Sequence, residues 1–160
     1  MFVAECDPDV ALVEILTSPS RRRIKHAGGK SMVIRKLMRS HENSIGIIDE
    51  DPNRFQPEDI QRFTETNFMN RDQIRILHHN QRNNRLIVLC PRLEEWIIGA
   101  SREAHMDLRN YNLPNDPNQL HEIINIRITK FRQLVKDLLR QRSSRVRSLR
   151  IWLMETQSRP

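Results

Sequence analysis

Two short apolar runs, each ending in acidic residues, constrain the fold of this chain more than any other feature. The first run ends at Ala4 and is followed by Glu5, and the second, Ser44–Ile48, is followed by Asp49 and Asp51. Both runs have the length and composition of buried strands. Strand patterns alternate with apolar residues at helical spacing up to residue 100. This alternation predicts an α/β fold with a mostly parallel sheet flanked by helices.

Turn residues and apolar spacing predict the remaining elements. The expected N-cap of the first helix is Asp7 or Asp9, and that of the second is Ser31, with Met32, Val33 and Leu37 facing inward. Further strands are predicted at 21–26, 73–78 and 85–90, a short helix at 57–63, a helix from Leu93 and one long helix beyond residue 118. A linker rich in Pro and Asn at 111–118 divides an α/β domain, residues 1–110, from a helical, basic C-terminal extension, residues 111–160.

Composition narrows the class of protein. No apolar run approaches the roughly 20 residues that cross a bilayer, and the acidic start of the chain is unlike a signal peptide. The two cysteines, Cys6 and Cys90, are too few for a disulfide framework. We therefore expect a reduced, cytoplasmic protein. Its 27 Lys and Arg against 20 Asp and Glu give a formal net charge of +7, which makes a polyanion the first partner to consider.

The acidic residues predict a metal site. The carboxyl ends of neighbouring parallel strands meet at one edge of a sheet, so Glu5, Asp49 and Asp51 are expected to converge there. Carboxylates packed together repel one another unless they are protonated or bridged by a cation. Oxygen ligands without a Cys/His cluster favour Mg²⁺ or Mn²⁺. The alternative is that these acids are ordinary turn and N-cap residues.

The two acidic motifs resemble those of the Toprim (topoisomerase–primase) domain, found in type II topoisomerases, primases, OLD-family nucleases and small defence-associated nucleases. FVAE, with Glu5, matches the first motif, and SIGIIDED, with Asp49 and Asp51, matches the second. The resemblance covers about residues 1–100. It implies a Toprim-like fold, Glu5 as a general acid/base that also contacts the metal, and Asp49 and Asp51 as catalytic metal ligands. Cys6 stands where the family usually has Gly.

The segment RLIVLCPRLEEWII also looks like part of the small Toprim-like nucleases. By that resemblance Glu94 or Glu95 supplies an extra acid, with Glu94 the expected additional ligand, although a helix N-terminus also favours acidic residues. The resemblance implies Mg²⁺- or Mn²⁺-dependent cleavage of phosphodiester bonds in DNA or RNA, in anti-phage defence or a toxin-like system. A larger partner protein such as an ATPase is expected to gate the activity, and an oligomer is compatible with the sequence.

Basic residues supply the expected contacts to nucleic acid. Lys30 follows two glycines in a GGKS segment that lacks the full P-loop spacing, so the alternative is a simple strand-to-helix turn. Arg82 and Arg85 belong to a polar stretch that also fits a solvated hairpin. Arginines of the C-terminal extension, Arg142, Arg145 and Arg147, complete the expected set. Apolar residues interleave with these arginines, which also fits docking on a partner protein.

Two other functions are compatible with these motifs. One is a non-catalytic Toprim-like interaction subunit of a larger, ATPase-containing complex, in which the acids are only turn formers. The other is a receiver-like phospho-signalling domain, which also gathers acids at strand ends but needs a Lys after its fifth strand. No Lys occurs between Phe68 and Ser101, which weakens the receiver interpretation.

Overall fold

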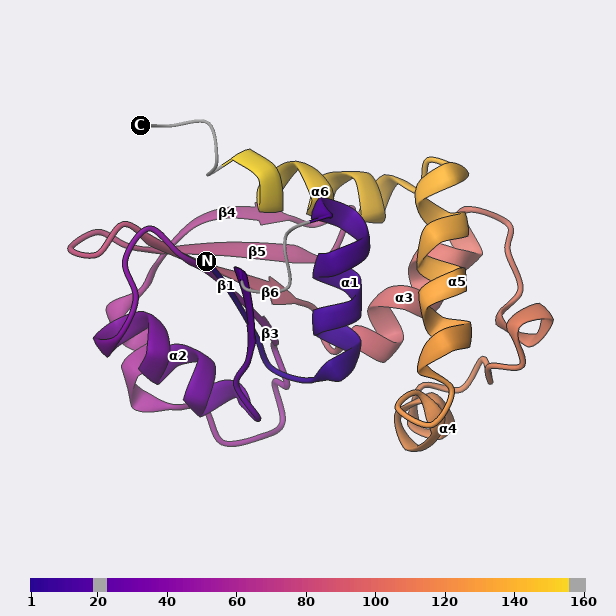
Figure 1. The fold of residues 1–160 in the computed structure, drawn as a ribbon, viewed down its shortest axis with the longest axis horizontal. Coiled ribbons are helices and arrows are strands. Elements are labelled where there is room, and N and C mark those ends of the chain that lie inside the picture. Colours follow the sequence, from indigo (N-terminus) through magenta and orange to yellow (C-terminus); the bar gives the residue numbers. More distant parts are fainter. Residues whose placement is uncertain (19–22, 156–160) are drawn as a thin grey trace.

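A six-stranded sheet organises the computed structural model, which describes residues 1–18 and 23–155 (Figure 1). The strands are β1 (Phe2–Ala4), β2 (Ile24–His26), β3 (Ile45–Asp49), β4 (Thr64–Met69), β5 (Ile74–His79) and β6 (Asn84–Leu89), in the spatial order β2-β1-β3-β6-β5-β4. The first four in this order are parallel neighbours, and β5 and β4 run antiparallel at one edge. The prediction of an α/β fold with a mostly parallel, helix-flanked sheet is confirmed.

Helices cover both faces of the sheet. They are α1 (Asp7–Thr17), α2 (Lys30–Arg39), α3 (Leu93–Glu103), α4 (Pro117–Ile123), α5 (Ile128–Arg140) and α6 (Ser144–Glu155), with short 3₁₀ helices η2 (Glu58–Arg62) and η3 (Leu108–Tyr111). Among the described residues, no helix has both the length and the apolar character needed to cross a membrane.

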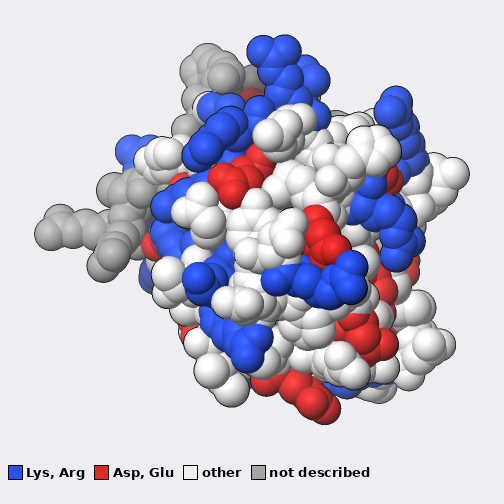
Figure 2. Space-filling view, turned by 90° about the vertical axis from the view of Figure 1, so that its right-hand side faces the viewer, with Lys and Arg blue, Asp and Glu red and all other residues white. Residues whose placement is uncertain are grey.

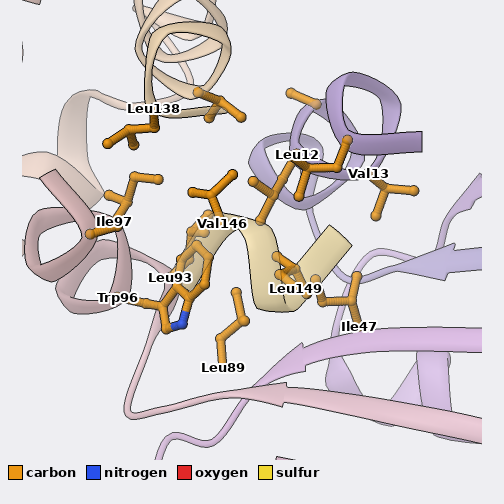
Figure 3. Packing of buried hydrophobic residues seen from close by; sticks show 14 of the residues in the cluster. Leu12, Val13, Ile47, Leu89, Leu93, Trp96, Ile97, Leu138, Val146 and Leu149 are labelled. Carbon is orange, nitrogen blue, oxygen red and sulfur yellow. The ribbon is translucent and has the colours of Figure 1, made fainter. Parts of the chain in front are cut away.

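Alternating side chains of the central strands divide the core into two layers. Ile47 and Leu89 belong to the larger layer, which α1, α3, α5 and α6 cover (Figure 3). Ile48 and Val88 belong to the smaller layer, under α2 and η2. Successive residues of a strand point to opposite faces, so one run of apolar residues in β3 or β6 serves both layers.

The C-terminal region corrects one prediction. The apolar stripe beyond residue 118 forms three helices, α4, α5 and α6, rather than one long helix. Arg142, in the turn between α5 and α6, has a left-handed backbone (φ 58°) that no helix interior allows. Phe131 of α5 and Val146 of α6 are fully buried in the same layer as Leu12 of α1. This core therefore extends across residue 110, and the predicted division into two domains stays a prediction.

Several element boundaries also differ from the predictions. The N-cap of α1 is Cys6, with Asp9 in the first turn, and α2 is capped by Gly29 rather than Ser31. Met32 is 36% exposed, whereas Val33 and Leu37 are buried as expected. Of the predicted strand 21–26, only Ile24–His26 is a strand within the described residues, and positions 21 and 22 lie outside them. The predicted linker 111–118 contains the start of α4.

The sequence patterns also missed β4. Its residues, TETNFM, are exposed or half-exposed at the sheet edge, so they carry no apolar run. A bulge between Glu65 and Asn67 interrupts its pairing with β5. Bulges and polar side chains are common devices that keep an edge strand from pairing with other molecules.

Candidate functional site

The acids at the strand ends meet at one edge of the sheet. Glu5 directly follows β1, and Asp49 is the last residue of β3, its parallel neighbour. The backbone N–H of Asp49 donates a hydrogen bond to Glu5 Oε2 at 3.2 Å. The topology thus brings together two acids that are 44 positions apart in the sequence.

The N-terminus of α3 lies at the same edge. The backbone N–H of Leu93, the first residue of α3, donates to Asp49 Oδ1 at 2.8 Å. The next residue, Glu94, is only 5% exposed, and its Oε1 lies 2.8 Å from His121 Nδ1. Its Oε2 is buried without a hydrogen-bond partner. Glu95 instead pairs with Arg92 at 2.6 Å, so of the two candidate acids only Glu94 contributes to this edge.

Asp9 is a further acid of this edge that sequence reasoning assigned only to capping. It is 1% exposed, and its Oδ2 accepts from the backbone N–H of Cys6 at 3.3 Å and from Cys6 Sγ at 3.1 Å. Its Oδ1 is buried without a hydrogen-bond partner. The signal in the sequence is Pro8, which marks a helix start. In the structure α1 begins at Asp7, so Asp9 is the third helical residue, from which a side chain folds back toward the N-cap. Glu5, Asp9, Asp49, Asp51 and Glu94 are called the acidic edge below.

Burial and mutual repulsion raise pKa values within the acidic edge. Burial is the largest cause for Asp49, and Asp9, Glu5, Glu94 and Asp51 add to it, which together raise its pKa to about 9. The pKa of Asp9 rises to about 7, mainly through burial. Burial also raises the pKa of Glu5, although the amide of Asp49 and the ammonium of Lys30 oppose the shift. At neutral pH the acidic edge therefore favours uptake of a proton or a cation.

Asp51 is the neutralised member of the acidic edge. Its backbone is left-handed (φ 46°), so Asp49 and Asp51 are not side by side in an extended segment as the Asp-x-Asp spacing predicts. Asp51 Oδ2 lies 3.4 Å from Lys30 Nζ, and both side chains are largely buried. Lys30 also donates to the backbone oxygen of Glu50 at 2.9 Å and to Gln56 Oε1 at 3.3 Å. Lys30 thus holds the loop after β3 instead of standing exposed to meet a phosphate chain.

The predicted nucleic-acid residues Arg82, Arg85, Arg142, Arg145 and Arg147 do not line the acidic edge. Arg85 lies opposite Ile45, at the start of β3, whereas Asp49 ends that strand. It is 9% exposed and pairs with Glu155 at 3.5 Å. Arg82 pairs with Glu42 at 3.6 Å, and Arg145 pairs with Glu103 at 3.1 Å. Arg142 and Arg147 are exposed and have no ion pair within residues 1–18 and 23–155.

The donor set of the acidic edge fits a hard cation in its chemistry. All its side-chain donors are carboxylate oxygens, and two of them, Asp9 Oδ1 and Glu94 Oε2, are buried without partners. Within the part of the chain that the structure describes, no group of three or more His, Cys, Asp or Glu is already arranged to hold a metal ion. Mg²⁺ commonly takes only one or two carboxylates and completes its shell with water and substrate phosphates, so it does not require such a group.

Compared with known proteins, the chain matches no protein-family model, no curated protein and no solved structure. The Toprim resemblance therefore depends on the sequence segments FVAE, SIGIIDED and RLIVLCPRLEEWII.

Proposed function

We propose that this protein is a Toprim-like nuclease that cleaves phosphodiester bonds in nucleic acid with Mg²⁺ or Mn²⁺, in anti-phage defence or a toxin-like system. The observation that carries the proposal is the hydrogen bond from the Asp49 backbone N–H to Glu5 Oε2. It places the acid of the first motif against the first acid of the second motif. Ligands of open α/β sheets bind at this edge, beyond the carboxyl ends of the strands.

The electrostatics of the acidic edge support a cation. Asp9, Glu5 and Glu94 all repel the charge on Asp49, and Lys30 balances only part of this charge, through Asp51. A divalent cation relieves the repulsion among buried carboxylates more effectively than a single proton does. Asp49 and Glu5 would donate oxygens to the cation, and water and substrate phosphate would complete its shell. Asp51 and Glu94, held by Lys30 and His121, would lie nearby.

Glu5 and Lys30 have different roles in the proposed reaction. A cation held by Asp49 and Glu5 would supply Lewis-acid polarisation of the scissile phosphate and stabilisation of the leaving oxygen. Glu5 accepts the proton of the attacking water on Oε1, the oxygen that does not face the Asp49 amide. Its raised pKa brings it closer to neutrality, where a general base works best. Lys30 positions Asp51 and the loop that follows β3.

One pair of contacts favours a second candidate, a non-catalytic interaction subunit of a larger, ATPase-containing complex. Asp51 is neutralised by Lys30, and Glu94 is held by His121. Paired acids of this kind also serve to fix loops and helix ends. This candidate predicts a stable complex with the ATPase that Glu5→Ala leaves unchanged, together with no cleavage by the wild type.

The deciding experiment measures cleavage of supercoiled plasmid and of single-stranded DNA and RNA with Mg²⁺ or Mn²⁺. Asp49→Asn is expected to lower the rate at least about 100-fold, the usual scale for losing an essential group at a reacting centre. Asp59→Asn is the matched control, because Asp59 is a partly exposed acid that pairs with Arg62 outside the acidic edge. Absence of cleavage with every cation, or equal rates in the wild type and Asp49→Asn, would reject the proposal.

A further inference from the structure

Helix α6 carries apolar side chains on two faces. Val146, Leu149 and Leu153 are fully buried, and Figure 3 shows Val146 and Leu149 pointing into the larger core layer. Ile151 and Met154 lie on another face and are 62% and 40% exposed. The buried side chains already anchor α6 to the core, so the exposed pair is not required for packing within the described chain.

The exposed face of α6 borders a hollow of about 630 Å³. Its apolar side chains are Leu139 from the end of α5, Ile151 and Met154. Its cationic side chains are Arg142, Arg147 and Arg150. Positions 147, 150, 151 and 154 are three or four residues apart, so they share one side of the helix. These six residues are called the arginine face. Figure 2 shows Lys and Arg side chains over much of this side of the molecule, including its top, where Figure 1 places α6 and the end of α5.

The three arginines of this face have no ion-pair partner in the described part of the chain. None of them makes an ion pair or a side-chain hydrogen bond within residues 1–18 and 23–155. The acid that also borders the hollow, Glu155, pairs with Arg85. Arg145 on the same helix differs, since it pairs with Glu103 and is largely buried. The arginine face thus consists of the partly exposed apolar side chains of Leu139, Ile151 and Met154, bordered by three arginines.

Arg142 adds a second observation. Its φ of 58° lies in the left-handed region, where Gly or Asn is the usual residue at the end of a helix. A residue with a Cβ at such a position costs some stability in the isolated chain.

The side chains of the arginine face favour a protein partner over single-stranded nucleic acid. No aromatic residue lines the hollow, so it lacks the stacking platforms with which proteins usually hold single-stranded nucleic acid. An aliphatic floor with Met instead suits the apolar side chains of another protein. The segments outside the described residues, 19–22 and 156–160, contain no Asp or Glu and cannot supply the missing charge from their side chains.

We propose that the arginine face binds an amphipathic, acidic helix of a partner protein. Its apolar stripe covers Leu139, Ile151 and Met154, and its carboxylates pair with Arg142, Arg147 and Arg150. The proposal does not depend on nuclease activity, because it uses no residue of the acidic edge.

The test measures binding by fluorescence anisotropy with two synthetic helical peptides. Both carry Leu along one stripe, and the remaining positions are Glu in the probe and Lys in the control peptide. The wild type is expected to bind the Glu peptide and not the Lys peptide, more weakly as salt rises. Arg147→Glu/Arg150→Glu is expected to weaken binding about tenfold or more, because two attractive pairs become repulsive. Ile151→Ser is expected to weaken it a few-fold through the apolar contact alone.

Arg35→Glu/Arg39→Glu is the matched control, since both arginines are exposed on α2, form no ion pair with another described residue, and give the same change in net charge. Equal loss of binding in this control would overturn the proposal, because the attraction would then be nonspecific. Failure of the Glu peptide to bind, or tighter binding of an oligothymidylate through the same arginines, would also overturn it. So would a dimer of the chain, seen by sedimentation, that Arg147→Glu/Arg150→Glu dissociates.

Discussion

The acidic edge and the arginine face each gather charges of one sign, but burial separates their physics. At the acidic edge, Asp9 and Glu94 are almost fully buried, so each charge interacts strongly with its neighbours and shifts their pKa values. At the arginine face, Arg147 and Arg150 are exposed, so water solvates them at little cost. The charges of the acidic edge therefore affect the folding stability, and their effect depends on pH. The charges of the arginine face mainly affect binding to other molecules, and their effect depends on the salt concentration.

The largest effect is expected from Lys30→Met, which removes the counter-charge of the acidic edge. Asp51 would then remain as an unpaired, largely buried carboxylate beside Glu5. We expect the free energy of unfolding at pH 7 to fall by about 3 kcal/mol. Urea unfolding measures this change. The double variant Lys30→Met/Asp51→Asn should recover most of the loss, and equal stabilities of the single and double variants would contradict the ion pair.

The next effect is a change in the pH dependence of stability. Asp49 has a folded pKa of about 9, raised from 3.8, so folding is favoured by its proton at low pH and loses that contribution as pH rises through this range. Asp49→Asn has no ionisable side chain at this position, so it does not lose this stability as the pH rises. We expect the variant to be more stable than the wild type at pH 8 and equal to it below pH 4. Thermal melts between pH 4 and pH 8 provide the measurement. If the stability of the two proteins changes with pH in the same way, Asp49 does not have a raised pKa.

A smaller gain in stability is expected at the arginine face. Arg142→Gly relieves the left-handed backbone and should raise the free energy of unfolding by about 1 kcal/mol. Arg142→Ala removes the side chain without relieving the backbone, so it serves as the matched control in the same urea titration. A gain in both variants would assign the effect to the charge rather than to the backbone.

The smallest effect is expected from Arg147→Glu/Arg150→Glu. Because neither side chain has an ion-pair partner within the described residues, the free energy of unfolding should change by less than about 0.5 kcal/mol. A loss of several kcal/mol in urea unfolding would show that these arginines stabilise the fold, and it would remove the contrast with the acidic edge.

The sequence predicted the meeting of Glu5 and Asp49 because parallel strands bring their carboxyl ends to one edge, whatever their distance along the chain. It could not predict the pairing of Lys30 with Asp51. That contact depends on the left-handed turn after β3 and on the position of the loop that carries Gln56. The role of Asp9 was hidden for a related reason, since an acid in the first turn of a helix has the same local pattern whether or not other acids face it.

The remaining differences in the fold have equally local causes. Strand β4 escaped prediction because its residues are exposed at an edge and carry no apolar run. The break between α5 and α6 escaped because Arg142 occupies a backbone conformation that Gly or Asn usually marks. The interior elements β1, β3 and β6 were predictable because burial on two faces imposes continuous apolar runs.

The central claim, that the acidic edge takes a divalent cation, is tested most directly by titrating Mn²⁺ at pH 8 and measuring the free ion by electron paramagnetic resonance. The wild type is expected to bind Mn²⁺ with release of a proton, because the Asp49 carboxyl, with its raised pKa, must ionise to act as a ligand. Asp49→Asn should lose this binding, and Asp59→Asn should keep it. Equal binding by the wild type and Asp49→Asn, or no binding by either, would contradict the account.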